Sequence, residues 1–397
     1  MAKQYLLKNK DTVVLSFDID YKTQVFENLV SHIAYIKSVE IVNKDLLPYN
    51  LHYQNNLSNN LEQWINKRKL PKNREFVHKI LATFNIQDHN NFMAYIDISL
   101  GLSLNDSFWI IPAESNYKWQ DYNLYDNSFN ETLALVAFTG YSTKIKGLIT
   151  SPEFTTNGML KKCWHRNKDT GKIELIKGQT EINGMIIGKE AYAEYYACQI
   201  AQILGLNAVY YELKKFHNQI VSCCDIFTNQ QHGYIPIAYC LDEKINYNDN
   251  TELFPAIIKI YGRENWQDLL LFDAIICNTD RHLANFGMLI NNDNNQIIQP
   301  APIFDNGSSI FNFIHSQDIN HIDELVNERT SWFQLSFDEQ AQFAVQKRHI
   351  KALLKLENFK FKRHKQYNLD EEMLTQIEQF IQQRSQKIMQ MLHNKQA

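Results

Sequence analysis

The chain has 397 residues, enough to bury more than one hydrophobic core, so we expect two or three domains or subdomains. Hydrophobic residues make up 44% and charged residues 21%, as in globular proteins, and no apolar run is long enough to span a membrane. The formal net charge of −4 argues against nucleic-acid binding as the dominant role. The start of the chain lacks an apolar segment with a cleavage site, so a cytoplasmic protein is predicted.

Residues 1–140 are predicted to form an accessory region of mixed α/β character. Alternating apolar and polar residues over 5–20 indicate a β-hairpin or a small sheet. Between Asn60 and Leu104 apolar residues recur every three or four positions, which indicates helices. The six cysteines form no C-x-x-C pair, so we expect reduced thiols.

Residues 141–237 read as short strands interrupted by one helix, which starts near Lys189 and ends before Gly205. Residues 238–397 are mainly helical, and the last segment, from about residue 369 to 392, carries one apolar stripe typical of a packed terminal helix. The overall prediction is an α+β protein made of an accessory region, a small strand-rich part and a helical part.

The stretch NTDRHLANFG, from Asn278 to Gly287, follows a strongly apolar helix and is the first candidate for chemistry. Asp280 and Asn285 stand in a D-x-x-x-x-N relation, in which Asp would accept a proton from an acceptor hydroxyl and Asn would hold magnesium. His282 is kept among the residues near the cofactor, although we favour a structural role in which it holds the loop by hydrogen bonds. A plain solvated turn remains the alternative for the loop alone.

A second motif, IFDNG, supplies the carboxylate of Asp305. The residues between Asn285 and Asp305 read as strand, Asn-rich turn and strand, and a hairpin brings its two ends together. Asp305 and Asn285 are therefore predicted to share one magnesium site, with Gly307 freeing the backbone to leave it.

A lysine at the end of a strand and a glutamate on the following helix form the third candidate. Lys177 would hold nucleotide phosphates and the glutamate would fix the lysine. The alternatives for the lysine are Lys161 and Lys162. Glu190 and Glu194 lie one helical turn apart, so spacing does not choose between them.

Two further segments are candidates for contacts with a nucleotide. Ser151, Thr155, Thr156 and Gly158 precede a strand and could wrap a phosphate, although the loop is neither G-x-G-x-x-G nor Walker A and an ordinary polar turn explains it equally well. The strand over 219–227 would lead into a hinge.

Backbone groups near Asp225 and Phe227 at the end of that strand could hold adenine. A plain core strand is the alternative.

Taken together, NTDRHLANFG followed by PIFDNGSS closely resembles the HipA-like serine/threonine protein kinases, including a subgroup whose phosphate loop begins with Ser-Pro. That subgroup also resembles this chain in SPEFTTNGMLKK, in Lys177 followed by glycine, and in a helical glutamate like Glu194 before Leu-Gly-Leu. The resemblance covers residues 148–310 firmly and the helical remainder more loosely.

The resemblance implies a two-lobed kinase fold, with 141–237 as the N-lobe and 238–397 as the C-lobe, and implies ATP, Mg²⁺ and transfer of phosphate to a protein Ser/Thr. By carry-over, Asp280 is the catalytic base, Asn285 and Asp305 bind magnesium, and Lys177 binds ATP. Ser151 matches a serine that related toxins autophosphorylate. DNG stands where ordinary protein kinases have DFG, so activation by flipping of an aromatic residue is not expected.

The leading hypothesis is a bacterial Ser/Thr protein kinase, either the toxin of a toxin–antitoxin pair with a small helix-turn-helix antitoxin as partner, or an effector that is translocated into a host. A phosphoinositide or small-molecule kinase is the first alternative, because D-x-H-x-x-N also resembles those enzymes. A catalytically silent binding module with the same fold is the second.

Overall fold

The computed structural model describes residues 3–26, 29–52, 56–69, 76–83, 91–141, 143–144, 148 and 150–395. These residues form two compact units that both contain helices and strands. Unit 1 comprises Met1–Ile176, Thr228–Ile235 and Leu289–Ile298, and unit 2 comprises Lys177–Phe227, Pro236–Met288 and Gln299–Ala397. The predicted division into residues 1–140, 141–237 and 238–397 stays a prediction.

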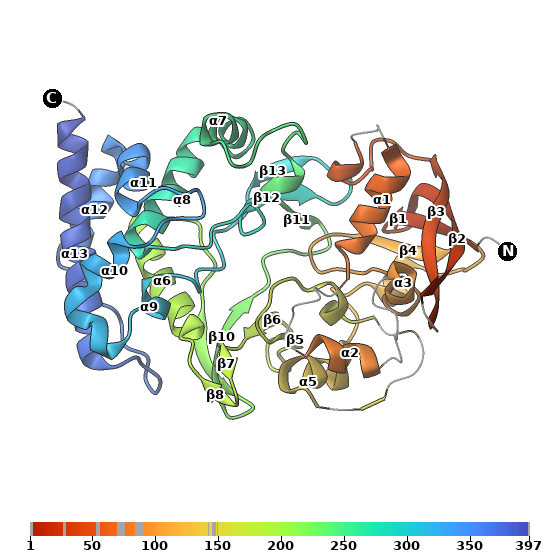
Figure 1. The fold of residues 1–397 in the computed structure, drawn as a ribbon, viewed down its shortest axis with the longest axis horizontal. Helices are drawn as coiled ribbons and strands as arrows, with labels where there is room; N and C mark the ends of the chain where they lie inside the picture. The colour runs from red at the N-terminus through yellow and green to blue at the C-terminus, as the bar shows by residue number, and fades with distance from the viewer. Residues whose placement is uncertain are drawn as a thin grey trace. The chain divides into compact units, whose positions relative to one another are not determined.

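The N-terminal part of unit 1 is built on a four-stranded antiparallel sheet in the order β3-β2-β1-β4 (Figure 1). Its strands are β1 (Lys3–Asn9), β2 (Thr12–Phe26), β3 (Leu29–Ile41) and β4 (Phe108–Pro112). Side chains from alternate positions of β1 and β2 share a hydrophobic core with Leu61, Trp64 and Ile65 of α1 (Leu57–Asn66). The predicted opening hairpin is confirmed.

Short helices complete this part of unit 1. They are η1 (Tyr49–Leu51), α2 (Val77–Thr83), α3 (Phe92–Ser99), α4 (Trp119–Tyr122) and α5 (Glu131–Thr139). Side chains of α2, α3 and α5 form a second core with Phe154. The helical pattern predicted after Asn60 thus corresponds to α1, α2 and α3, and Phe84, which belonged to that pattern, lies outside the described residues.

Three later segments belong to unit 1 as well. The 3-10 helix η3 (Pro152–Thr155) precedes the neighbouring strands β5 (Lys162–Arg166) and β6 (Ile173–Lys177), which end at the boundary of the unit. Residues 228–235 and 289–298 are tied to the N-terminal part by side chains. Asn9 Nδ2, for example, donates a 2.7 Å hydrogen bond to the carbonyl of Asn292. Strands β11 (His232–Pro236), β12 (Gly287–Asn291) and β13 (Ile297–Pro300) form a three-stranded sheet in that order.

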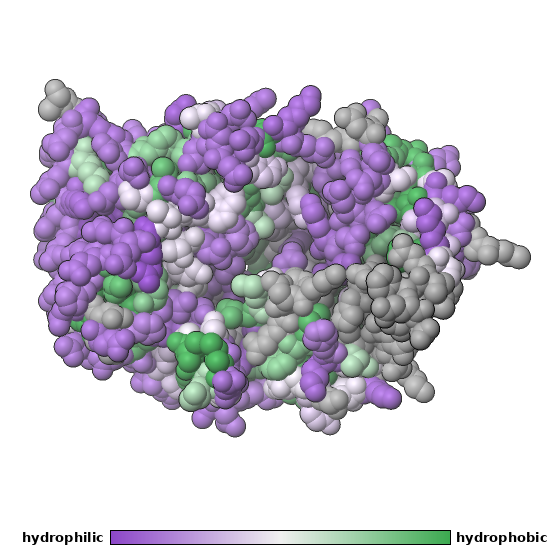
Figure 2. Space-filling model, viewed as in Figure 1, coloured by the Kyte–Doolittle hydropathy of each residue, from purple (hydrophilic) through white to green (hydrophobic). Residues whose placement is uncertain are grey.

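Unit 2 begins with a small hairpin and one long helix. Strands β7 (Glu181–Ile182) and β8 (Met185–Ile186) pair antiparallel, and their apolar side chains are exposed, as Figure 2 shows by the green patch over the hairpin. Helix α6 (Glu190–Leu204) is rich in alanine, the best helix former, and ends where Gly205 adopts a left-handed φ of 71°. The predicted helix and its glycine stop are confirmed.

The rest of unit 2 is a β-hairpin followed by helices. Strands β9 (Glu212–Phe216) and β10 (Gln219–Asp225) pair antiparallel. The helices are η4 (Ile237–Tyr239), α7 (Asn250–Tyr261), α8 (Arg263–Ile276), α9 (Ile310–Phe313), η5 (Ser316–His321), α10 (Ile322–Asn327), α11 (Phe337–Ala344), η6 (Lys347–His349), α12 (Ile350–Leu356) and α13 (Glu371–Asn394). Helix α11 packs on α8, and α12 packs on α13 (Figure 1). The predicted terminal helix is confirmed, because Leu374, Ile377 and Ile381 form its buried stripe.

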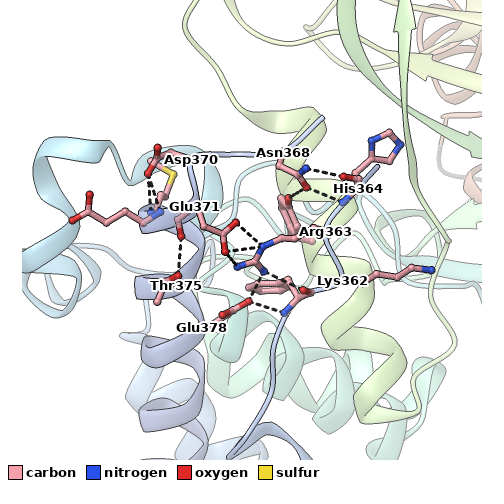
Figure 3. A network of polar contacts seen from close by, with 12 residues as sticks. Lys362, Arg363, His364, Asn368, Asp370, Glu371, Thr375 and Glu378 are labelled. Carbon is pink, nitrogen blue, oxygen red and sulfur yellow. Dashed lines mark hydrogen bonds and ion pairs between the residues drawn. The ribbon is translucent and has the colours of Figure 1, made fainter. Parts of the chain in front are cut away.

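An arginine-centred network holds the segment between α12 and α13 (Figure 3). Arg363 donates from Nε to both carboxylate oxygens of Glu371, at 3.2 and 3.0 Å, and from Nη1 to Glu378. Glu378 also accepts a 2.8 Å hydrogen bond from the amide of Phe361. The same segment contacts α6, because Gln199 exchanges two hydrogen bonds with the backbone of Lys362.

No helix in the described part of the chain is long and apolar enough to cross a membrane. All six cysteines are free thiols, as predicted. Burial raises the pKa of Cys198 to about 12 and that of Cys277 to about 11, so these two thiols stay protonated near neutral pH.

Candidate active site

Helix α8 delivers the NTDRHLANFG loop from the core of unit 2. The helix is buried along most of its length, and its C-cap residue, Cys277, has a left-handed φ of 52°. Asn278 then donates from its backbone to the carbonyl of Asp273 at 3.0 Å, and its side-chain oxygen accepts the amide of Asp280 at 3.1 Å. The loop therefore leaves a rigid helix in a defined direction, which suits a catalytic segment.

Within the loop, Asp280 is exposed and Asn285 is buried. Asn285 Nδ2 donates a 2.9 Å hydrogen bond to the carbonyl of Asp280, which orients the amide of Asn285. The amide of His282 donates to the carbonyl of Asp280 at 2.9 Å, and His282 Nδ1 accepts from the amide of Ala284 at 3.2 Å. These local bonds match the structural role that we favoured for His282.

The pKa of Asp280 lies above its usual value. The surrounding protein partly desolvates the carboxylate, although the residue keeps an exposed surface, and this desolvation is the main cause; His282 and Arg281 oppose the shift, and the negative charge of Asp305 adds to it. A carboxylate with a raised pKa is a better proton acceptor near neutral pH than an ordinary Asp.

Arg281, which the motif search did not single out, is the centre of the loop. Its side chain is 1% exposed, and all five of its N–H groups are used. Nε and Nη2 donate to the two oxygens of Asp273, each at 2.9 Å. Nη1 donates to the carbonyls of Asn285 and Phe304, and Nη2 also donates to the side-chain oxygen of Asn306 at 2.7 Å. The loop and the DNG motif are thus fastened to α8 by one residue.

Lys177 and two carboxylates form the second part of the site. Lys177 Nζ lies 2.9 Å from Glu194 Oε1 and 2.9 Å from Asp305 Oδ1. Burial alone would lower the pKa of Lys177, but Asp305 and Glu194 hold it well above its ordinary value, so the lysine stays charged. Burial raises the pKa of Glu194, and Lys177 counteracts that shift.

The structure settles which glutamate pairs with the lysine. Glu194 accepts from Lys177, whereas Glu190 accepts hydrogen bonds from the backbone and hydroxyl of Thr180 and holds the base of the β7–β8 hairpin. Lys161 and Lys162 are buried in unit 1, and Lys162 donates to the carbonyl of Asn157. Lys177 has the carboxylate partners expected of a phosphate-binding residue, and the choice among the three candidate lysines stays a prediction.

Asp305 itself adopts a left-handed backbone with φ of 60°, a conformation that Asp tolerates better than most residues. Its amide donates to Tyr211 Oη at 3.2 Å, and its side chain remains 40% exposed. The expectation that Gly307 frees the backbone was wrong, because the left-handed turn falls on Asp305. A Cβ at Gly307 would lie 3.3 Å from Cβ of Glu190, a tight contact that favours glycine there.

The four candidates in the Ser-Pro loop belong to unit 1. Ser151 is 1% exposed, and its hydroxyl has no hydrogen-bond partner among the described residues. Thr155 and Thr156 hydroxyls donate within the unit, to the carbonyls of Leu102 at 2.9 Å and Pro152 at 2.6 Å. Gly158 has φ of 95°, which favours glycine. Their role in phosphate binding stays a prediction.

The two hinge candidates differ in their surroundings. Asp225 is exposed at the end of β10, whereas the ring of Phe227 packs 5.5 Å from the ring of Phe304. Phe304 immediately precedes Asp305, and both rings border a small core formed by Cys198, Val209 and Tyr211. Adenine binding near these residues stays a prediction.

The residues present fit a nucleotide–magnesium complex by their chemistry. Asp305 and Asn285 offer oxygen atoms, which Mg²⁺ prefers, and Lys177 offers a charged ammonium for phosphate. Within the described residues no cluster of three or more His, Cys, Asp or Glu side chains suited to a metal occurs. Mg²⁺ commonly takes one or two protein ligands, with phosphate oxygens and water completing the coordination, so Asn285 and Asp305 would suffice as protein ligands.

The sequence motifs did not single out Arg281, Asp273 or Asn306, although one signal in the sequence pointed to Asp273 and Arg281. Asp273 is a lone charge in the otherwise apolar run LLLFDAIIC. A charge at such a position is tolerated only with a buried partner, and Arg281 is the arginine nearest to it along the chain.

Comparison with known proteins places this geometry in context. No family model matches the sequence. A stretch of 154 residues is 29% identical to the serine/threonine-protein kinase CtkA of Helicobacter pylori; it covers 34% of this chain and 46% of that protein, so the match spans about half the length of the curated relative.

Solved structures extend the comparison to the fold. A chain in the complex of the Shewanella oneidensis toxin–antitoxin system HipA, HipB and its operator DNA matches over 97% of both chains, with a TM-score of 0.52 and 11% identity. The crystal structure of the Helicobacter pylori proinflammatory kinase CtkA matches 60% of this chain and 92% of its own, with a TM-score of 0.47 and 20% identity. The chain therefore has the HipA-like kinase fold, and the predicted resemblance to HipA-like serine/threonine kinases is confirmed.

Proposed function

We propose that this protein is an ATP- and Mg²⁺-dependent serine/threonine protein kinase of HipA type. The observation that carries the proposal is the contact of Lys177 with both Glu194 and Asp305, in the same unit as a loop that presents Asp280 and Asn285. The sequence relative is named a serine/threonine-protein kinase, which favours a protein acceptor over a lipid or small molecule.

Each residue has one role in this proposal. Asp280 accepts the proton of the acceptor hydroxyl, and its exposure leaves it accessible to a protein side chain. Lys177, held by Glu194, binds phosphate oxygens; Asn285 and Asp305 hold the metal. Bound MgATP supplies the γ-phosphoryl group, while the metal neutralises charge on its oxygens. Arg281 keeps the loop and the DNG motif in place through its five hydrogen bonds.

The test is a phosphotransfer assay with γ-labelled ATP and a generic protein acceptor. Asp280→Ala is expected to lower the rate by at least about 10²-fold, the usual contribution of a general base, while nucleotide affinity stays nearly constant. Asp323→Ala is the matched control, because Asp323 is an exposed aspartate in α10 of the same unit. Equal rates for the wild type and Asp280→Ala would refute the assignment.

The same assay has an informative pH dependence. The raised pKa of Asp280 means that the base gains its proton at a higher pH than an ordinary Asp does. The acid limb of kcat/KM should therefore have an apparent pKa above about 3.9. A rate that stays constant down to pH 4 would contradict this role for Asp280.

Ser151 is proposed as an autophosphorylation site. Because its side chain is buried, the loop must open before the hydroxyl can react. Intact-mass measurement after incubation with ATP should show a gain of one phosphate that Ser151→Ala abolishes. A gain that persists in the variant would assign the phosphate to another residue.

The partner implied by the family resemblance is a small helix-turn-helix antitoxin. The proposal of this partner rests on that resemblance and not on the similarity in fold. Phosphoproteomics of cells that express the wild type or Asp280→Ala would identify the protein substrate. Co-purification from the native host would recover a stable antitoxin, and its absence from the purified protein would favour the effector role.

A further inference from the structure

Asn306 occupies the position directly after the candidate metal-binding Asp305, where ordinary protein kinases carry a phenylalanine. Its side chain is completely buried. Asn306 makes two separate hydrogen bonds across the site. The backbone amide donates to Glu194 Oε2 at 2.8 Å, and the side-chain oxygen accepts from Arg281 Nη2 at 2.7 Å.

These two contacts join the parts of the site that the proposed function treats separately. Glu194 divides its carboxylate, with Oε1 on Lys177 and Oε2 on the amide of Asn306. Arg281 in turn holds the carbonyl of Asn285 in the catalytic loop at 3.1 Å. An unbroken series of hydrogen bonds therefore runs from Lys177 through Glu194, Asn306 and Arg281 to the loop.

The choice of asparagine at this position has a cost. Asn306 Nδ2 is buried without a hydrogen-bond partner among the described residues, and unsatisfied buried donors are rare in folded proteins. A leucine of similar volume would leave no such donor, but it would also offer no oxygen to Arg281. The side-chain oxygen is therefore the part of Asn306 that packing alone does not require.

We propose that Asn306 is a positioning residue that keeps the phosphate-binding pair Lys177–Glu194 in register with the catalytic loop, through its contact with Arg281. The predicted change in kcat rests on the proposed kinase function, whereas the predicted change in the structure of the loop does not. It also accounts for an asparagine in place of the aromatic residue: the polar side chain bonds across the site to the catalytic loop through Arg281, a contact that a phenylalanine ring could not make.

Three variants separate this role from simple packing. Asn306→Leu removes the oxygen and the unpaired donor while keeping the backbone contact with Glu194. Asn306→Asp keeps an acceptor oxygen for Arg281 at the same position. Asn250→Leu is the matched control, because Asn250 Nδ2 makes one long-range hydrogen bond, 2.8 Å to the carbonyl of Phe333, elsewhere in the same unit.

The variants are compared by two measurements: amide hydrogen exchange of the nucleotide-free protein, and the kcat of the active protein in phosphotransfer. Amide hydrogen exchange should become at least about tenfold faster in residues 278–286 of Asn306→Leu, with α13 unchanged, and should return toward the wild-type rate in Asn306→Asp. The kcat of Asn306→Leu should fall about 10²-fold, as for a small misplacement of catalytic groups, with nucleotide affinity preserved. Asn250→Leu should change neither quantity.

Other results overturn the proposal. Unchanged exchange in residues 278–286 would mean that Asn306 does not hold the loop, whatever happens to kcat. Faster exchange throughout unit 2, including α13, would mean that the residue only stabilises the fold. A wild type with no more phosphotransfer than Asp280→Ala would refute the kinase function, and the exchange measurement would then still decide the role of Asn306.

Discussion

The networks around Arg281 and Arg363 in unit 2 use the same chemistry in different surroundings. Arg281 is 1% exposed and spends its five N–H groups on one carboxylate, two carbonyls and one amide oxygen. Arg363 is 27% exposed and pairs with Glu371, which is 71% exposed, and with Glu378, which is 5% exposed (Figure 3). The two networks differ in how readily water can replace a lost hydrogen-bond partner.

The comparison teaches that burial, more than the number of bonds, decides what such a network does. Arg281 and Asp273 are each only 1% exposed, so bulk solvent would not readily replace a lost partner, and the geometry of the loop depends on these bonds. Around Arg363 solvent shares the charges, so its ion pairs fasten a surface segment without defining a site. Arg281 therefore belongs to the candidate active site. Arg363 instead holds the segment between α12 and α13 that contacts α6.

Removal of the buried guanidinium should have the largest effect. Arg281→Met leaves the carboxylate of Asp273 buried without its partner, and the free energy of unfolding should fall by about 3–5 kcal/mol. Urea denaturation followed by circular dichroism would measure this. The double variant Asp273→Leu/Arg281→Met should recover part of the loss, and a single-variant loss below about 1 kcal/mol would show that Asp273 is not dependent on Arg281.

Arg363→Gln should have an intermediate effect. Glu378 loses a charged donor but keeps the amide of Phe361, and solvent reaches the rest of the network. We expect the free energy of unfolding to fall by about 1–2 kcal/mol, as for a hydrogen bond to a partly buried charge. A loss as large as that of Arg281→Met, measured in the same urea experiment, would contradict the distinction between the two networks.

Glu371→Gln should have the smallest effect, and the effect should depend on pH. The hydrogen bond from Arg363 lowers the pKa of Glu371 in the folded protein. The stabilising contribution is therefore fully present above the unfolded pKa of about 4.3 and disappears as pH falls through the lower folded pKa.

The measurement is the urea midpoint of the wild type and Glu371→Gln at several pH values between 7 and 2.5. The small difference between them should vanish at the acid end. Glu372→Gln is the control, because Glu372 is also exposed in the first turn of α13 but accepts no hydrogen bond from Arg363 in the described structure. A difference that grows on acidification would contradict the lowered pKa.

Much of the fold could be predicted because local patterns carry it. The alternation in β1 and β2, the alanine-rich α6 with Gly205 behind it, and the apolar stripe of α13 each follow from the period of the element. The compact units were not predictable in this way. Residues 228–235 and 289–298 join unit 1 through contacts such as Asn9 with Asn292, which lie 283 positions apart and leave no local signature.

For the candidate site, the residue types and their order can be read directly from the amino-acid sequence: Lys177, the helical glutamates, Asp280, Asn285 and Asp305. Tertiary structure alone decided which of them meet. Glu190 and Glu194 share a helical face, so only the position of Lys177 separated them. The left-handed turn at Asp305 and the roles of Arg281 and Asn306 also depend on partners distant in the chain, because burial and long-range hydrogen bonds, unlike helical or strand period, are properties of the folded molecule.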